Sequence, residues 1–358
     1  MNKKVFGLVF VLLMILVFVS VMFLMPNNSS NKKQNNITRT GETVFGISYP
    51  PIQNQEQIDF TIDHMKKLDS ELVRFSTTWK IREPVKGEYS WNGLDKKINS
   101  FYRNDISILL TINSIAPEWE CDVKNEQSCT FKNSENFRLF IRELVKRYSG
   151  KIDKIQFGNE WNTEWHFVGT AEEFTEYTNI VYEETKKYSP NTEVVLGGVT
   201  RSVPLYLVVC EGQDTLKYPL YFNAGAKQVS KAEAYEGCSG SKQKVEYVIK
   251  NAKYDLVDLH MYDEYENWDE YYNALKKQVD VPIIVTEFGI EEGFSPKYNP
   301  GESHSKQVEK AMQKLESLGV PEAYYFNLID GLSTGPHKNS GLITQALKEK
   351  PAYYVFKI

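Results

Sequence analysis

Short apolar runs alternate with longer amphipathic segments from Thr43 to the end of the chain. The runs are rich in β-branched residues and mostly apolar throughout, which is typical of parallel strands that are buried on both faces. Eight of them are predicted to be strands: Val44–Tyr49, Glu71–Ser76, Ile106–Ile112, Ile152–Gly158, Glu193–Val199, Leu256–Tyr262, Val281–Phe288 and Glu322–Asn327. Intervening segments are predicted to be helices: Trp91–Asn104, Glu135–Tyr148, Ala171–Tyr188, Gln243–Asn251, Trp268–Lys277 and Lys306–Leu318.

Capping residues support two of these helices. The segment Asn133-Ser134-Glu135 offers an N-cap for the helix predicted from Glu135, and Thr170 opens a capping box with Glu173. Eight alternations of strand and helix indicate parallel pairing through right-handed crossovers, and eight parallel strands can close into a filled barrel. The sequence therefore predicts an α/β fold, a (β/α)8 TIM barrel. A doubly wound open sheet is the alternative, but it usually has a Gly-rich phosphate loop after an early strand, and none stands there.

The segment before the barrel has a different pattern. Lys3 and Lys4 precede an apolar run from Val5 to Met25, which reaches the roughly 20 residues that a helix needs to cross a membrane. A cleavable signal peptide usually has a shorter apolar region and a small-x-small cleavage site. We therefore expect residues 1–25 to form an uncleaved membrane anchor with the lysines on the cytoplasmic side. A long signal sequence that is removed by cleavage is the alternative.

The rest of the chain divides into a linker and one large domain. Residues 26–42 are polar and lack apolar periodicity, so they are predicted to be a flexible linker. Residues 43–358 are predicted to be the barrel domain. Within this domain, Thr200–Ser241 has no clear periodicity and is expected to be an extended loop after strand five, on the catalytic face.

The four cysteines fall into two close pairs, Cys121 with Cys129 and Cys210 with Cys238. An even number of cysteines in an exported protein indicates disulfides, and we expect the two local pairings, although four cysteines allow three. A zinc site is the alternative, but neither a CxxC spacing nor a nearby His supports it.

Composition narrows the range of partners. The 42 Lys and Arg and the 47 Asp and Glu are mixed along the chain, so no concentrated basic face is expected for a nucleic acid. The five His lack the clustered pattern of a metal-dependent barrel hydrolase, so we expect neither a metal nor another cofactor. The oligomeric state is not predicted.

The functional side chains of a TIM barrel lie at the carboxyl ends of its strands and in the loops that follow them. Candidate site residues are therefore the polar and aromatic residues at these positions: Arg74 and Trp79 (strand two), Asn113 (three), Asn159 and Glu160 (four), His260 and Tyr262 (six), Glu287 (seven) and Phe326 (eight).

Glu160 and Glu287 are predicted to face each other across the barrel mouth. Cleavage of a glycosidic bond with retention needs two carboxyl groups ~5 Å apart, one protonated and one ionised. A nearby Arg keeps a carboxylate charged, and Arg74 is the candidate for this task beside Glu287. Tyr262 could donate a hydrogen bond to the same carboxylate, and Asn159 could bind a sugar hydroxyl.

Ordinary structural roles compete with these hypotheses. A single Glu after a strand is most often solvated, Arg74 could form a structural ion pair, and His260 could be a core histidine. Apolar strands precede both Glu160 and Glu287, and their neighbours are Asn, Trp, Phe and Gly, which favours a functional role. Four tryptophans could either pack in the core or stack on sugar rings: Trp79, Trp119, Trp161 and Trp165.

Several motifs occur together and in order: Val73-Arg74-Phe75, Trp79–Pro84, Gly87–Trp91 with Leu94-Asp95, Asn159-Glu160, His260-Met261-Tyr262, Ile284–Gly289 and Lys350–Tyr354. They resemble the clan A glycoside hydrolases, the 4/7 superfamily of barrels with catalytic glutamates on strands four and seven, and the resemblance covers essentially all of residues 43–358. It implies that Glu160 is the acid/base and Glu287 the nucleophile. It also implies that Asn159 binds a substrate hydroxyl and that three residues frame the nucleophile: Arg74, His260 and Tyr262.

Two positions depart from the family pattern. Many members have a Trp at the end of strand eight, where this chain has Tyr325 and Phe326, and a His at the end of strand three, where it has Asn113. Both positions contact the sugar, so the resemblance to cellulases, mannanases and xylosidases does not specify the substrate.

We therefore expect an extracytoplasmic retaining glycoside hydrolase that cleaves β-linked O-glycosidic bonds in an oligo- or polysaccharide. A transglycosylase would use the same covalent intermediate, and the sequence does not separate the two. A carbohydrate-binding barrel without catalysis is the other alternative. The glutamate pair together with Arg74 and Tyr262 favours an enzyme, because a binding module has no need of an acid/base pair.

Overall fold

Eight parallel strands form a closed barrel, which confirms the predicted fold. The computed structural model describes residues 42–200, 203, 221–222, 227–228, 242–262, 265–290, 303–331 and 337–357. Around the barrel the strands follow chain order: β1 (Val44–Ser48), β2 (Leu72–Thr78), β3 (Ser107–Asn113), β6 (Lys154–Asn159), β7 (Glu193–Val199), β10 (Leu256–Tyr262), β11 (Ile283–Gly289) and β12 (Glu322–Tyr325). All eight correspond to predicted strands, although β12 ends before the predicted Asn327.

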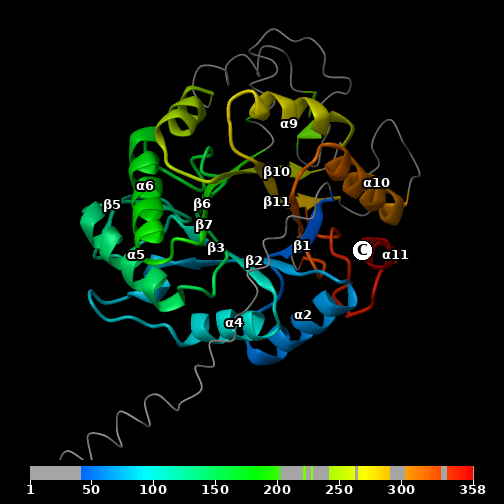
Figure 1. The fold of residues 1–358 in the computed structure, drawn as a ribbon, viewed down its shortest axis with the longest axis horizontal. Helices are drawn as coiled ribbons and strands as arrows, with labels where there is room; N and C mark the ends of the chain where they lie inside the picture. The colour runs from blue at the N-terminus through cyan, green and yellow to red at the C-terminus, as the bar shows by residue number, and fades with distance from the viewer. Residues whose placement is uncertain are drawn as a thin grey trace, which may run out of the picture. The chain divides into compact units, whose positions relative to one another are not determined.

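Helices surround the strands (Figure 1). Their bounds are α2 (Gln55–Lys67), α3 (Trp79–Arg82), α4 (Asn92–Arg103), α5 (Ser134–Tyr148), α6 (Ala171–Tyr188), η1 (Tyr265–Asn267), α9 (Trp268–Lys276), α10 (His304–Ser317) and α11 (Pro351–Phe356), and residues 242–251 are also helical. Both predicted caps are present, because Asn133 accepts a hydrogen bond from the backbone of Glu135 and Thr170 forms the capping box with Glu173.

The apolar pattern does not single out α2, because polar residues share its buried side. Ile58 and Met65 are buried, but so are Thr61 and His64. The His64 ring is 2.8 Å from the hydroxyl of Tyr353 on α11. A tertiary partner therefore makes burial of this polar side chain possible, and such a partner is not visible from local periodicity.

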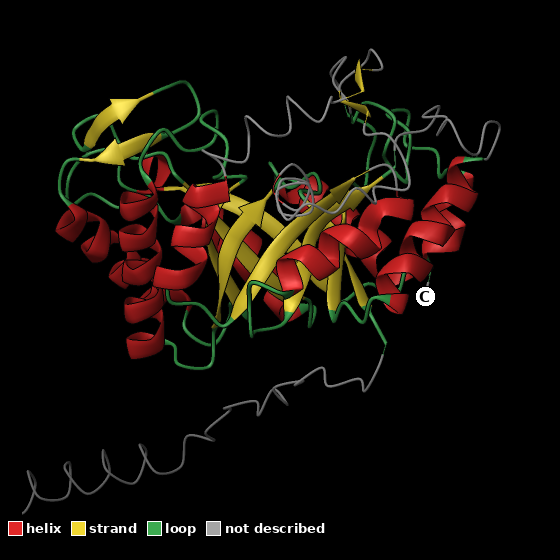
Figure 2. Cartoon of the chain, turned by 90° about the horizontal axis from the view of Figure 1, so that it is seen from above, coloured by secondary structure: helices red, strands yellow, loops and turns green. Residues whose placement is uncertain are grey.

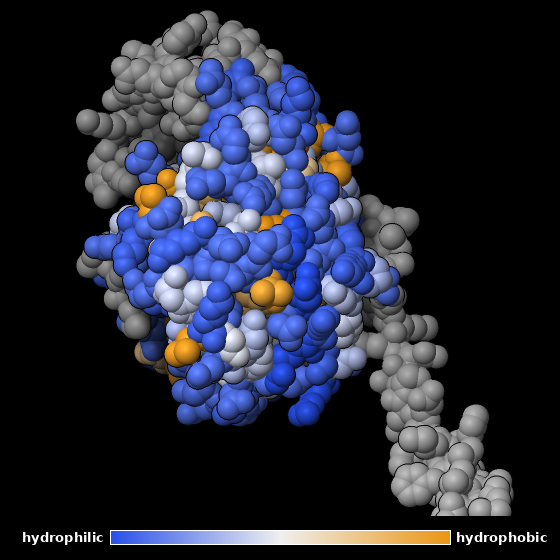
Figure 3. Space-filling view, turned by 90° about the vertical axis from the view of Figure 1, so that its left-hand side faces the viewer, coloured by the Kyte–Doolittle hydropathy of each residue, from blue (hydrophilic) through white to orange (hydrophobic). Residues whose placement is uncertain are grey.

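The outer helices bury one side and expose the other. In α5 the buried residues include Phe137, Phe140, Ile141 and Leu144. The surface on the side of the barrel that carries α5 and α6 is mostly hydrophilic, with isolated hydrophobic side chains (Figure 3). Single exposed hydrophobic residues of this kind are ordinary for a soluble domain.

The barrel interior below the strand ends is polar. Gln156 on β6 accepts hydrogen bonds from Arg74 on β2 (3.0 Å) and Thr111 on β3 (2.9 Å). It donates to Asp258 on β10 (2.6 Å), which also accepts from the backbone of Thr286 on β11 (2.8 Å). Buried polar groups are costly unless they are hydrogen-bonded, so this network fixes the side chains that lie under the barrel mouth.

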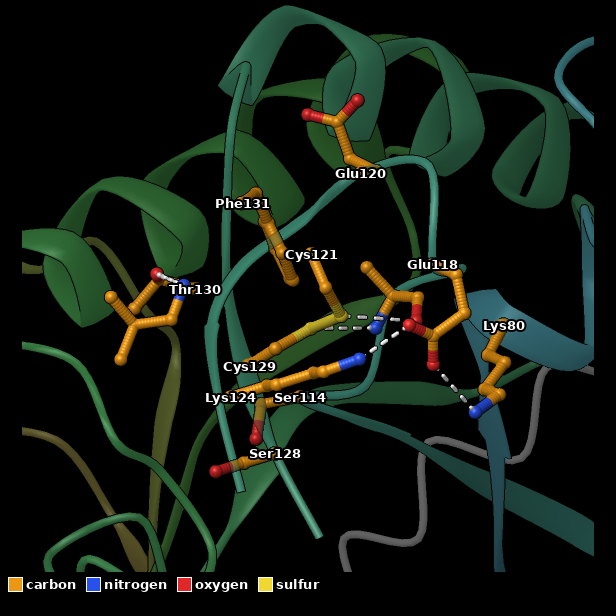
Figure 4. The surroundings of a disulfide bond; sticks show 12 residues. Lys80, Ser114, Glu118, Glu120, Cys121, Lys124, Ser128, Cys129, Thr130 and Phe131 are labelled. Atoms are coloured by element: carbon orange, nitrogen blue, oxygen red, sulfur yellow. Dashed lines mark hydrogen bonds and ion pairs between the residues drawn. A yellow bond between two sulfur atoms is a disulfide. The ribbon is translucent and has the colours of Figure 1, made fainter. Parts of the chain in front are cut away.

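A short hairpin extends from the loop after β3. Its strands are β4 (Cys121–Lys124) and β5 (Cys129–Phe131), which pair antiparallel. The predicted disulfide between Cys121 and Cys129 joins them (Figure 4). The hairpin lies at the end of the barrel to which the strand arrows point (Figure 2). It is therefore on the catalytic face of a TIM barrel.

Several predictions concern residues outside the described ranges. They are the anchor at residues 1–25, almost all of the linker at 26–42, the pairing of Cys210 with Cys238, and most of the extended loop Thr200–Ser241. Within that loop, the structure describes two short strands, β8 (Tyr221–Phe222) and β9 (Lys227–Gln228). Among the helices that the structure describes, none is both long and apolar enough to span a membrane.

Replacing both Cys121 and Cys129 by Ser should lower the free energy of unfolding by about 2 kcal/mol, because the short loop between them gains freedom in the unfolded chain. Urea unfolding followed by circular dichroism measures the difference. Val123→Ala in the same hairpin is the control, since this side chain is 58% exposed and its loss should change stability by less than about 0.5 kcal/mol. Equal stability of the double variant and the wild type would contradict the prediction.

Candidate active site

A cleft of ≈ 420 Å³ opens where the barrel strands end. Its walls come from residues at the carboxyl ends of β1, β6, β10, β11 and β12 and from two loops. The lining residues are Tyr49, Asn159, Glu160, His166, Tyr262, Glu287, Phe326 and His337. Both glutamates that the sequence analysis singled out therefore share one cleft.

Glu287 on β11 has a partner on each carboxylate oxygen. Arg74 Nη1 donates to Oε1 at 2.5 Å, and the hydroxyl of Tyr262 donates to Oε2 at 2.5 Å. Burial and the charge of Glu287 raise the pKa of Tyr262 well above its usual value, so the hydroxyl keeps its proton and acts as a donor. The two contacts hold the Glu287 carboxylate in place through one oxygen each.

Arg74 lies beneath the cleft and has no exposure to solvent. Its Nη2 donates to Asn159 Oδ1 (2.7 Å), and Nη1 also lies 3.2 Å from the hydroxyl of Ser48. The guanidinium carbon is 4.9 Å from the centre of the Tyr49 ring. A buried charge needs such partners, and together they hold the guanidinium against Glu287.

Glu160 stands immediately after β6 in a left-handed backbone conformation, with φ of 48°. Two residues earlier, Gly158 has φ of 76°, and a Cβ there would collide with the ring of Phe174. A non-glycine residue in this conformation costs about 1 kcal/mol or more, and such strain is found where the surrounding structure holds a functional side chain. The turn directs Glu160 into the cleft.

A histidine lies at each oxygen of Glu160. His260 Nδ1 is 3.0 Å from Oε1, and His166 Nδ1 is 3.6 Å from Oε2. Burial lowers the pKa of His260, but the charges of Glu287 and Asp258 and the hydrogen bonds to Asp258 and Glu160 outweigh burial and raise it to about 10. Burial raises the pKa of Glu160, and the hydrogen bond and charge of His260 outweigh that effect, so the pKa lies below its usual value.

Glu160, His260 and Glu287 have ligand atoms that all lie within 4.8 Å of one another, the arrangement that a metal ion would need. Their acceptor atoms already face cations of the protein. Arg74 donates to Glu287, and the ring of His260 is cationic at neutral pH. These positive charges oppose binding of a metal cation at the same atoms.

Most of the predicted site residues come together. Asn159, Tyr262 and Phe326 line the cleft with the two glutamates, and Arg74 and His260 contact the carboxylates from below. Asn113 ends β3 outside the cleft lining, and its amide oxygen is buried without a hydrogen-bond partner.

Trp79 requires a correction. Its side chain is 1% exposed, stacks on Phe140 at 5.6 Å and donates from Nε1 to Glu83 at 2.6 Å. Because it is packed in the core between the barrel and α5, Trp79 does not line the cleft, and its predicted contact with a sugar is not possible in this position. Trp161 is likewise fully buried.

Three lining residues were not predicted: Tyr49, His166 and His337. Tyr49 directly follows β1, and the rule that residues at strand ends form the site could have found it. His166 and His337 lie in loops, six residues after Glu160 and in the segment after β12, where no periodic pattern indicates which side chain turns inward.

A (β/α)8 barrel with two carboxylates facing each other at its mouth is the arrangement of barrel glycoside hydrolases. A family model described as "Cellulase (glycosyl hydrolase family 5)" matches residues 31–329, and the chain belongs to this family. A search of the curated proteins found no match.

Solved structures share the fold at low sequence identity. The exo-β-1,4-mannosidase Op5Man5 from Opitutaceae bacterium strain TAV5 has a TM-score of 0.61 and 14% identity, over 88% of this chain and 58% of that protein. A family 39 glycoside hydrolase from Bacteroides cellulosilyticus WH2 has a TM-score of 0.62 and 14% identity, over 88% and 64%. A variant of a GH5_18 protein from Streptomyces cattleya, in complex with Manβ1-4GlcNAc, has a TM-score of 0.61 and 12% identity, over 88% and 79%. The chain thus spans less than two thirds of the first two proteins.

Gly198→Ala should lower the rate of cleavage of an aryl β-glycoside by about 100-fold, because a displacement of about 1 Å at the active site can reduce the rate by that factor. The new Cβ would collide with Asp258 Oδ2 and His260 Nε2 and displace the histidine from Glu160. Gly93→Ala on α4 is the control, since the nearest atom to its Cβ is 3.9 Å away. Initial rates of both variants test this, and full activity of Gly198→Ala would contradict the tight packing beneath His260.

The raised pKa of His260 predicts a pH dependence of stability. Three carboxylates face its ring, from Glu160, Glu287 and Asp258. The proton that the folded state holds contributes its full stability below the usual pKa of about 6.5, and that stability is lost as the pH rises through about 10.

Wild type and a His260→Asn variant should therefore differ most in unfolding free energy below about pH 6.5, and the difference should shrink as the pH rises towards 10. Urea unfolding at a series of pH values measures both proteins, and titrations that they share cancel in the difference. A difference that stays constant from pH 6 to pH 10 would contradict the cationic state of His260.

Proposed function

We propose that this protein is an extracytoplasmic retaining glycoside hydrolase that cleaves β-linked O-glycosidic bonds in an oligo- or polysaccharide. One observation carries the proposal: ligand oxygens of Glu160 and Glu287 lie within 4.8 Å of each other in one cleft. Retaining enzymes have carboxyl groups ~5 Å apart, whereas inverting enzymes need roughly 6.5–9.5 Å to admit a water molecule. The short separation favours retention.

Glu287 is the nucleophile in this mechanism. Its ionised carboxylate attacks the anomeric carbon and forms a covalent glycosyl-enzyme, while the bond to the leaving oxygen breaks. Arg74 and Tyr262 hold the carboxylate in place through one oxygen each. Asn159, which Arg74 fixes through its amide oxygen, keeps its amide nitrogen as a donor towards a sugar hydroxyl.

Glu160 is the acid and base. It gives a proton to the leaving oxygen in the first step and takes one from water in the second. The lowered pKa of Glu160 is opposite to what an acid needs, but His260 holds a proton at Nδ1, 3.0 Å from Glu160 Oε1. A sugar that enters the cleft removes water from the carboxylate and so disfavours its charge. The proton then moves from His260 to Glu160, where it reaches the leaving oxygen.

The family and the related folds support a β-linked substrate. The chain matches a cellulase family model. One of the similar structures is an exo-β-1,4-mannosidase, and another is a complex with Manβ1-4GlcNAc. Of the two positions that depart from the family pattern, Phe326 lines the cleft and Asn113 does not.

We place the enzyme outside the cytoplasm, tethered by the apolar run of residues 5–25 or released after its cleavage. The disulfide between Cys121 and Cys129 supports an oxidising compartment, because disulfides rarely persist in the cytosol. The two lysines before the apolar run support a cytoplasmic N-terminus.

Glu287→Gly should reduce turnover of aryl β-glycosides on the order of 10⁶-fold, because the covalent step is lost. Sodium azide or formate should restore turnover, since a small anion can attack the anomeric carbon from the vacated side. With azide the product should be the α-glycosyl azide, which NMR identifies. No rescue, or a β-glycosyl azide, would contradict the nucleophile assignment.

Glu160→Ala is the matched comparison. It should lose roughly 10²–10⁴-fold with poor leaving groups and less with dinitrophenolate, which departs without a proton. Wild-type products analysed by NMR immediately after cleavage should retain the β-configuration. A wild type that binds saccharides without turnover would instead support the carbohydrate-binding alternative.

A further inference from the structure

Asp258 is a buried carboxylate that has no part in the steps of catalysis described above. It lies on β10, two residues before His260, and its side chain has no exposure to solvent. A carboxylate in the protein interior is costly unless hydrogen bonds and positive charges surround it. Its contacts therefore show what maintains the charge and which neighbours the charge acts on.

The partners of Asp258 come from three other strands and from its own. Oδ1 accepts a hydrogen bond from the backbone of Thr286 (2.8 Å), and Oδ2 accepts from Gln156 Nε2 (2.6 Å) and from the Thr286 hydroxyl. Oδ2 is also 3.4 Å from His260 Nε2. Burial raises the pKa of Asp258, but the charge and contact of His260 and the charge of Arg74 outweigh burial and lower it. The carboxylate is therefore ionised at neutral pH.

The atoms beneath the His260 ring determine which ring nitrogen keeps its proton. Nε2 is 3.4 Å from Asp258 Oδ2 and 3.3 Å from the hydroxyl of Thr286. An ionised carboxylate can only accept, and the Thr286 hydroxyl uses its single proton for Asp258. Nε2 therefore faces acceptors alone and keeps its proton whether the ring is neutral or cationic.

The other nitrogen of His260 carries the proton that can be exchanged. Nδ1 is 3.0 Å from Glu160 Oε1 and 3.5 Å from Glu287 Oε2. A carboxylate behind a histidine is a known way to fix the tautomer and the orientation of an imidazole that transfers protons. The exchangeable proton of His260 is thus directed at the proposed acid and base.

Close packing keeps this arrangement in place. Gly198 on β7 lies against the pair, and a Cβ there would be 2.4 Å from both Asp258 Oδ2 and His260 Nε2. Neither side chain is exposed to solvent. The ring of His260 therefore has little freedom to turn away from Asp258.

The titratable groups around His260 differ in their relation to the cleft. The carboxylates of Glu160 and Glu287 line the cleft, as does His166, whose pKa is lowered by burial. Asp258 does not line it. A substrate that fills the cleft displaces water from the lining residues and so changes their electrostatic surroundings. Asp258 thus supplies a negative charge whose own surroundings stay the same when substrate binds.

We propose that Asp258 is a positioning residue for the reaction and acts on Glu160 through His260. From beneath the ring it keeps a proton on Nε2, so the proton that moves to Glu160 is the one on Nδ1. In that step the N–H bond at Nδ1 breaks, an O–H bond forms at Oε1, and the cationic ring becomes neutral. After Glu160 has taken a proton from water in the second step, it returns that proton to Nδ1. The inference rests on the proposed retaining hydrolase and deepens it, because it assigns the proton supply of the acid.

The pH dependence of kcat/KM tests this role. Its alkaline limit reports loss of the proton that Glu160 and His260 share. Asp258→Asn should lower this limit by about 1–3 pH units for a phenyl β-glycoside, because the ring loses an opposite charge at short distance. With the 2,4-dinitrophenyl β-glycoside of the same sugar, the variant should keep most of the wild-type kcat/KM, since this leaving group departs without a proton.

Asp255→Asn is the matched control. Asp255 immediately precedes β10 at the opposite end of the strand, where its Oδ2 accepts from the backbone of Val194 and from Lys186, each at 2.7 Å. The substitution removes a carboxylate from the same segment without affecting the contacts of His260. Its pH profile should coincide with that of the wild type for both glycosides.

NMR of the wild type gives a second test, which stays decisive if Asp258→Asn fails to fold. In protein labelled with ¹⁵N-histidine, the signals of His260 are those that disappear in His260→Asn. As the pH rises, the Nδ1 signal should change from that of a protonated to that of an unprotonated nitrogen. The Nε2 signal should remain that of a protonated nitrogen throughout.

The outcomes separate this inference from the function on which it rests. The positioning role is wrong, and the hydrolase assignment stands, if the wild type cleaves the glycosides but Asp258→Asn keeps the wild-type alkaline limit. An equal loss of rate with both glycosides at every pH would also overturn the role, as would a neutral His260 with its proton on Nδ1. If the wild type cleaves neither glycoside, the proposed function fails, and the role of Asp258 in the reaction fails with it.

Discussion

The guanidinium of Arg74 is shielded from solvent in the middle of the barrel mouth, and the arrangement of the site depends on it. Moving such a charge from water into a protein costs several kcal/mol unless polar partners surround it. The partners are Glu287 and Asn159 on the cleft side and Gln156 and Thr111 on the core side. The same contacts that satisfy Arg74 therefore position the proposed nucleophile and connect it to the buried network below.

Two carboxylates in one cleft repel each other, and the structure separates their surroundings. Glu287 is held by a permanent cation, whereas Glu160 is held by His260, which can give up its proton. A permanent cation suits a carboxylate that acts as the nucleophile, whereas a titratable partner suits a carboxyl group that has to gain and lose a proton. The absence of a side chain at Gly198 leaves the space in which His260 lies.

The hairpin that the disulfide closes contacts the loop on the Glu160 side of the cleft. The loop after β6 has no regular structure of its own, so its conformation depends on contacts with neighbouring segments. Asn125 and Ser128 of the hairpin and Ser114 of β3 supply those contacts. The aromatic residues around Glu287, in contrast, come from the ends of barrel strands and from the segment after β12. One side of the cleft thus follows from the barrel itself and the other from an added element.

The sequence by itself determined the barrel, the local disulfide and the positions of Glu160 and Glu287, because strand periodicity and the rule of strand ends are local signals that survive in the fold. It did not distinguish the buried Trp79 from the exposed Trp165, since both follow a barrel strand in segments where no periodic pattern shows which side chain is buried. It also contained no sign that His166 lines the cleft, because the position of this side chain depends on the turns of the loop after β6. These features were decided by tertiary packing, because only contacts between segments distant in sequence settle which side chains of a loop face the cleft.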